Sequence, residues 1–167
     1  VEASPLRQAS PCKHFGEPDG DQRGCGGCTL QHMGYEDQLA WKAQQVRAQF
    51  EAFGLSTTPI RPILGHQPPW HYRNKMEFSF GFDSQTRYAI GLHPGGFRHN
   101  VLRLDSCEIF SPWVAEILPT LRTWFETHGT APHEGAKGTG FLRSLTFREG
   151  KKTGERMLDL MTSGDPE

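Results

Sequence analysis

The sequence lacks long hydrophobic runs and any strong excess of charge of one sign. No apolar segment approaches the roughly 18 residues of a membrane-spanning helix, and no signal peptide is visible, so we expect no membrane partner. The 167 residues carry a net charge of −1, and a nucleic-acid partner must therefore be argued from local charge. Hydrophobic residues make up only 35%, but the chain is long enough to bury a core.

Motifs that bind nucleotide cofactors are also missing. The chain contains neither G-x-x-x-x-G-K-[ST] nor G-x-G-x-x-G, and no complete SAM-binding motif, so no cofactor-binding residue is assigned. Cysteine is scarce, with four residues. Without an export signal, four cysteines favour a metal site in a reducing, cytoplasmic environment over two disulfides. A small secreted disulfide protein is the less favoured alternative.

The four cysteines have the spacing of a metal site. Cys25 and Cys28 form a C-x2-C pair around two glycines, Cys12 precedes the pair by twelve intervening residues, and Cys107 follows far downstream. Thiolates two residues apart can bind one metal group, and glycines allow the backbone to approach it closely. Three neighbouring cysteines and one remote cysteine favour an iron–sulfur cluster. Tetrahedral zinc stays open, although zinc ribbons usually have two such pairs and this chain has one.

Two histidines flank the cysteines. His14 and His32 could each bind a metal, but four cysteines already complete a closed site. We therefore expect neither to be a ligand, and we expect His32 to pack or hydrogen-bond at the start of a helix.

Hydrophobic periodicity predicts two main helices. Apolar residues recur at three- and four-residue spacing over 35–53 and form one stripe, followed by a capping glycine. Ser111 and Pro112 predict the start of a second helix, with the serine as cap and the proline at the first helical position. That helix should stop at Gly129, and Pro119 should kink or split it.

Alternating apolar and polar residues predict the strands. The expected strands span residues 75–82, 88–93, 101–107, 141–148 and 155–162. Phe78, Phe80 and Phe82 of the first strand are expected in the core. Residues 1–34 form a cysteine-rich loop region, and no alternating βαβ run is present. The fold class is therefore α+β, with a mostly antiparallel sheet and two main helices.

A basic segment leads into the first strand. Between His71 and Arg103 the sequence has five arginines or lysines and two acidic residues, a local charge of +3. Cations beside aromatic residues are typical of single-stranded RNA binding, because cations hold phosphates and rings stack on unpaired bases. The candidate RNA-binding residues are Arg73, Asn74 and Lys75, at the start of the strand.

Several connected motifs resemble those of a known family. They are C-K-H-F-G at 12–16, C-G-G-C-T-L-Q-H at 25–32, Y-R-N-K-M-E-F-S-F-G at 72–81 and D-S-C at 105–107. Together they resemble RNA (uracil-5-)methyltransferases, in the branch that carries a [4Fe–4S] cluster and includes enzymes methylating uridines of 23S ribosomal RNA. The resemblance covers about residues 4–162.

The resemblance implies a ligand set and a domain organisation. The cluster ligands would be Cys12, Cys25, Cys28 and Cys107, and the 73–75 stretch would lie near the RNA, either 23S rRNA or tRNA. Residues 11–162 would be a central iron–sulfur and RNA-binding domain. Residues 1–10 would be the exit from an N-terminal TRAM domain, and 163–167 the start of the linker to a C-terminal SAM-binding domain.

The resemblance also implies that the reaction takes place outside this chain. The family uses a cysteine that adds to uracil C6 and a base that removes the C5 proton, and no position here matches either. We therefore assign no catalytic residue and expect an excised, monomeric piece that is inactive alone. One departure from the family is a polar stretch at 17–23, expected to be a surface insertion. The alternative function is a stand-alone zinc-binding RNA-recognition module.

Overall fold

The computed structural model describes residues 2, 4–16, 24–135 and 137–164. The predicted insertion at 17–23 therefore lies outside the described residues. The helices and strands, in chain order, are α1 Tyr35–Ala52, β1 Lys75–Phe82, β2 Tyr88–Gly91, α2 Val114–Thr127, β3 Leu142–Glu149 and β4 Arg156–Thr162. All strand pairs are antiparallel, which confirms the α+β class. Neither helix has the length and apolarity needed to cross a membrane.

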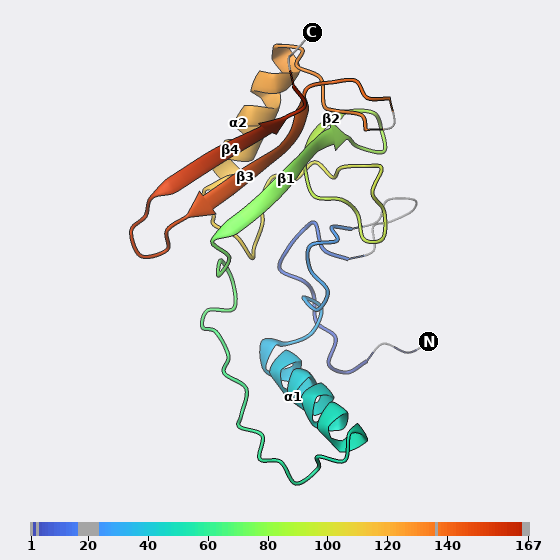
Figure 1. The fold of residues 1–167 in the computed structure, drawn as a ribbon, viewed down its shortest axis with the longest axis vertical. Coiled ribbons are helices and arrows are strands. Elements are labelled where there is room, and N and C mark those ends of the chain that lie inside the picture. Colours follow the sequence, from blue (N-terminus) through green and yellow to red (C-terminus); the bar gives the residue numbers. More distant parts are fainter. Residues whose placement is uncertain (1, 3, 17–23, 136, 165–167) are drawn as a thin grey trace.

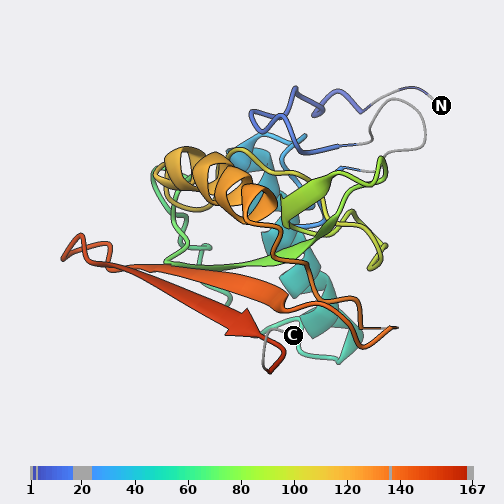
Figure 2. The ribbon, with the colours of Figure 1, turned by 90° about the horizontal axis from the view of Figure 1, so that it is seen from above.

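The strands form one sheet in the order β2-β1-β3-β4. Figure 2 shows α2 lying against one face of this sheet. The core forms between them, where Phe78 of β1 meets Phe147 of β3 edge to face with ring centroids 5.3 Å apart. Phe78 and Phe80 are buried as predicted, but Phe82 is 37% exposed. The prediction for Phe82 was wrong because this residue ends β1 at the turn.

Two details of the predicted second helix were wrong. The helix begins at Val114, and Ser111 does not cap it, since the Ser111 hydroxyl donates to Glu149 Oε1 at 2.8 Å. Pro119 does not split it, and α2 is one helix from Val114 to Thr127. A proline five residues into a helix lacks one backbone hydrogen bond, and the buried apolar side of α2 outweighs that loss.

Residues 101–107 are not a strand, contrary to the prediction. The N–H groups of Leu102 and Leu104 donate to the carbonyls of Leu92 and Ile90 at 2.9 and 3.3 Å. The segment therefore follows β2 but exchanges too few bonds with it to form a regular ladder. Its course carries Cys107 toward the N-terminal loops.

α1 does not pack on the sheet. Figure 1 shows it apart from the strands, at the far end of a long irregular connector that returns to β1. None of its residues is buried, and Val46 and Phe53 of its apolar stripe are 43% and 79% exposed. The predicted helix is confirmed, but Tyr35, Leu39 and Phe50 of its stripe are only partly buried.

Candidate metal centre

The four cysteines meet around one small cavity. Cys12, Cys25, Cys28 and Cys107 all line it, and each is a partly buried free thiol. The fold thus brings residues from three separate loops to one place. Their grouping fits a shared metal group, and their role as ligands stays a prediction.

Backbone hydrogen bonds hold the C-G-G-C loop in this position. The Cys25 N–H donates to the carbonyl of His14 at 2.7 Å, and the Gly26 N–H donates to that of His93 at 3.0 Å. At Gly27 a Cβ would come within 2.9 Å of the Leu92 side chain and 3.4 Å of Cys25 Sγ. Glycine there keeps the space beside the sulfur open.

Asp105 joins the loop of Cys107 to the loop of Cys12. Its Oδ1 accepts from the buried Arg122 of α2 at 2.9 Å, and its Oδ2 pairs with Lys13 at 3.1 Å. The Asp105 N–H also donates to Nε2 of His14 at 3.3 Å. Burial alone would raise the pKa of Asp105, but hydrogen bonds from Lys13 and Arg122 lower it. The D-S-C motif contained Asp105, yet spacing alone gave it no role.

Burial disfavours the ionised form of the thiols. It raises the pKa of Cys25 to about 11, with smaller upward contributions from the neighbouring cysteines. Burial also raises the pKa of Cys28 and of Cys107. Any metal group that binds here must therefore displace protons from the sulfurs.

Hydrogen-bond donors already face three of the sulfurs. The Gly27 N–H lies 3.4 Å from Cys25 Sγ. Burial raises the pKa of Cys28 and of Cys107, and this rise is partly offset by hydrogen bonding from the Gln31 side chain and from the Ile109 and Phe110 backbone, respectively. Such donors stabilise thiolates that bind metals and tune iron–sulfur clusters. Four thiols and these donors therefore fit an iron–sulfur cluster.

Among the described residues, no three His, Cys, Asp or Glu side chains are close enough together to hold one metal ion. The choice between an iron–sulfur cluster and zinc therefore stays a prediction from the sequence.

The two histidines near the cysteines make contacts that stabilise the surrounding loops. His14 lines the cysteine cavity, and its Nε2 is occupied by the Asp105 N–H. His32 stacks on Phe15 with ring centroids 5.7 Å apart, which confirms the prediction that it packs.

The candidate RNA-binding stretch lies beside the cysteines. The Arg73 N–H donates to the Ile109 carbonyl at 3.0 Å, which joins the stretch to the residues that follow Cys107. Burial raises the pKa of Cys28, and the positive charge of nearby Arg73 partly offsets that rise. Arg73 is partly buried, whereas Asn74 and Lys75 are exposed.

A cationic pair on the sheet was not found from the sequence. Lys75 of β1 lies directly opposite Arg148 of β3, and both are exposed. Neither has an ion-pair partner within the part of the chain that the structure describes. Like charges in this position are unfavourable unless an anion lies between them, so the pair suits a phosphate. The pair can be recognised only from the register between β1 and β3, which the sequence does not give.

Two other basic residues of the segment are structural. Arg87 pairs with Asp83 at 2.8 Å and stabilises the turn between β1 and β2. Arg103 donates to the Tyr88 carbonyl at 3.0 Å. Of the five cations of the segment, Arg73, Lys75 and the exposed Arg98 therefore remain available for a ligand.

Comparisons with known proteins identify relatives of this chain. No protein-family model matches it. It is 34% identical over 156 residues to an uncharacterized RNA methyltransferase of Protochlamydia amoebophila, covering 93% of this chain and 34% of that protein. It is 32% identical over 163 residues to another such protein, from Caldanaerobacter subterraneus, covering 98% of this chain and 35% of that protein. The chain thus spans about a third of the length of these relatives.

A solved structure shares the fold. It is the tRNA (uracil-54, C5)-methyltransferase of Pyrococcus abyssi in complex with S-adenosyl-L-homocysteine, with a TM-score of 0.70 and 23% identity. The match covers 99% of this chain and 34% of that one. The resemblance to RNA methyltransferases that the motifs indicated is therefore confirmed.

Proposed function

This chain is related to RNA methyltransferases over about one third of their length, and from that premise we propose that it is the central part of a SAM-dependent RNA (uracil-C5) methyltransferase. In this proposal it carries a [4Fe–4S] cluster and contacts the RNA. The observation that carries it is the meeting of all four cysteines around one cavity beside Arg73. In this proposal a metal site and a cationic surface are therefore neighbours.

The proposed ligands are Cys12, Cys25, Cys28 and Cys107. When bound, the cluster would join the three loops that carry these residues, a structural contribution that couples metal binding to folding. The residues of this chain then position the RNA, with Arg73 and Lys75 holding phosphates and Asn74 within reach of a base or phosphate. Arg148 joins them because it lies opposite Lys75.

Methyl transfer is assigned to parts of the protein outside this chain. The solved neighbour acts on uracil at C5 of a tRNA and was bound to S-adenosyl-L-homocysteine, which supports SAM as methyl donor and uridine as target. We propose 23S rRNA as the substrate, with tRNA as the alternative. The proposal keeps the domain boundaries given above, with residues 1–10 as the exit from a TRAM domain, 11–162 as the central domain and 163–167 as the start of a linker. It also takes the whole enzyme to be monomeric and cytoplasmic, and this piece to be inactive alone.

Metal analysis tests the cluster. Protein purified without oxygen should contain about four iron atoms and four acid-labile sulfides per chain and should absorb visible light. Stoichiometric zinc without sulfide would contradict the cluster and favour a zinc-binding RNA-recognition module.

RNA binding tests the positioning residues in the intact protein. Arg73→Ala and Lys75→Ala should each weaken RNA binding and reduce the slope of log affinity against log salt by about one phosphate contact. Arg87→Ala is the matched control, because its guanidinium pairs with Asp83. An unchanged salt slope in both variants would place the RNA elsewhere.

Transfer of labelled methyl groups from SAM to C5 of uridine, read after RNA digestion, tests the reaction itself.

A further inference from the structure

A second cavity, of about 650 Å³, lies between the cysteine loops, the start of α1 and the connector before β1. Its size is within the range of sites that bind small organic groups. It shares Gly27, Cys28, Gln31 and Ile109 with the lining of the cysteine cavity. The C-G-G-C loop is therefore a common wall of the two cavities.

Four residues that line this cavity carry aromatic or heteroaromatic rings. They are Tyr35, His66, Trp70 and Tyr72. Lys42 adds a positive charge, and the described lining residues include no carboxylate. A ring-lined cavity without negative charge suits a flat, polar group attached to an anion.

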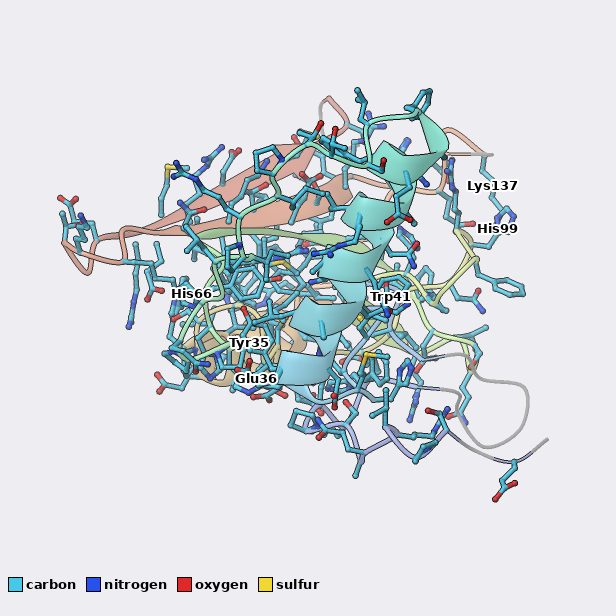
Figure 3. The ribbon with its side chains drawn as sticks, turned by 90° about the horizontal axis from the view of Figure 1, so that it is seen from below. Tyr35, Glu36, Trp41, His66, His99 and Lys137 are labelled. Atoms are coloured by element: carbon cyan, nitrogen blue, oxygen red, sulfur yellow. The ribbon has the colours of Figure 1, made fainter. Side chains whose placement is uncertain are left out.

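The rings are held in place by contacts between α1 and the connector. The Tyr35 hydroxyl accepts a hydrogen bond from the His66 N–H at 2.8 Å, and Figure 3 shows these two residues side by side near the start of α1. The His66 and Tyr72 rings are 6.1 Å apart and inclined by 56°. Tyr72 is 48% exposed, so its ring remains accessible to a ligand.

One amide in the lining has a fixed orientation. Both hydrogen bonds of Gln38 Nε2 go to protein carbonyls, to Leu30 at 3.0 Å and to Met33 at 2.9 Å. These bonds hold the amide so that Oε1 is left to accept a hydrogen bond. Every nucleobase carries an N–H group on its Watson–Crick edge that can donate to such an oxygen.

We infer that this cavity binds one unpaired nucleobase of the RNA, an inference that rests on the proposed function. The base stacks on Tyr72 and donates to Gln38 Oε1, while Lys42 holds a neighbouring phosphate. RNA is favoured over a free nucleotide because Arg73 follows Tyr72 directly and extends the contact toward Lys75 and Arg148 on the sheet. Single-stranded RNA is recognised by this combination of stacked bases and paired phosphates.

The test compares two labelled ligands on the intact protein by fluorescence anisotropy. One is an oligouridylate of about 12 nucleotides, and the other is an abasic ribose-phosphate strand of the same length. Wild-type protein should prefer the oligouridylate. Tyr72→Ala should lower the affinity for oligouridylate roughly fivefold to 150-fold, the range for loss of one stacked base, and should leave abasic binding unchanged. Arg73→Ala should weaken both ligands alike.

Trp41→Ala is the matched control. Trp41 is an exposed ring on α1 that does not line the cavity, and in Figure 3 it lies on the other side of the helix from Tyr35. Equal wild-type affinity for the two ligands, or equal losses in Tyr72→Ala and Trp41→Ala, would overturn the base site while leaving RNA binding intact. Efficient competition by uridine monophosphate alone would overturn the assignment to RNA. Failure of both ligands to bind would remove the proposed function as well.

Discussion

Two halves of this chain are stabilised by different interactions. We call the residues before Lys75 the cysteine half and the residues from Lys75 onward the sheet half. Every buried hydrophobic side chain lies at Met76 or later, whereas Gln31 is the one buried side chain among the described residues before Lys75. The sheet half therefore has a core that apolar burial can stabilise. The cysteine half has none, and hydrogen bonds, ion pairs and a proposed metal group must hold it together. The comparison shows that apolar burial is concentrated in one part of the described chain, while the other part lacks it.

The largest expected effect comes from removing a cluster ligand. Cys25→Ser should abolish iron binding and expose the hydrogen-bonded backbone amides of the cysteine loops, such as those of Cys25 and Gly26, to solvent exchange, while β1 and β3 stay protected. The reason is that the cysteine half has no buried apolar core that could stabilise it without the metal group. Hydrogen exchange followed by mass spectrometry measures both halves at once.

Thr29→Ala is the control for that experiment, because Thr29 is an exposed neighbour of Cys28. If the cysteine half of iron-free Cys25→Ser were as protected as that of the iron-loaded protein, the contrast between the two halves would be wrong.

The sheet half should respond to loss of apolar volume instead. Phe78→Ala should lower the free energy of unfolding by about 3–5 kcal/mol, because the ring is fully buried against Phe147. Denaturant unfolding followed by circular dichroism measures the loss. Phe82→Ala, at a residue that is 37% exposed, should cost clearly less. Equal losses in the two variants would contradict the position of the core.

A smaller loss of stability is expected from a change at Asp105, which joins the two halves. Asp105→Asn should lower stability by about 1–3 kcal/mol, because it leaves the buried Arg122 guanidinium without its carboxylate. Iron occupancy should also fall, since the Cys12 and Cys107 loops lose a common partner. Lys13→Ala removes only the ion pair to the Cys12 loop, so it should lower iron occupancy as well but cost less stability, because that side chain is 61% exposed. If Asp105→Asn retained wild-type stability and iron content, the halves would be joined by other contacts.

The smallest expected effect is acid sensitivity within the sheet half. Burial alone would raise the pKa of Glu149, but bonds from Lys151 and Ser111 and the charge of Arg156 lower it. A lowered folded pKa means that stability is present above the unfolded value, about 4.3, and is lost as pH falls through the folded pKa. Glu149→Gln should therefore flatten the loss of stability below about pH 4. An unchanged acid profile, read by thermal unfolding, would refute this contribution.

Local patterns predicted most elements because each depends on near neighbours. The alternation around Phe78 predicted β1 at its observed bounds, and the stripe from Tyr35 predicted α1. The pattern at 101–107 failed, because a segment can alternate and still lack a partner that returns its hydrogen bonds. Pro119 does not split α2, because tertiary packing exceeded a local preference.

The sequence by itself determined the chemistry of this protein, namely four thiols with a C-x2-C pair, a basic stretch before a strand, and motifs that resemble those of RNA methyltransferases. The tertiary structure alone decided which groups meet. It brought Cys107 to Cys12 through Asp105, set Lys75 opposite Arg148, and left a ring-lined cavity beside the cysteine loop. The physical reason is that periodicity and spacing act over a few residues, whereas these contacts depend on how distant segments pack.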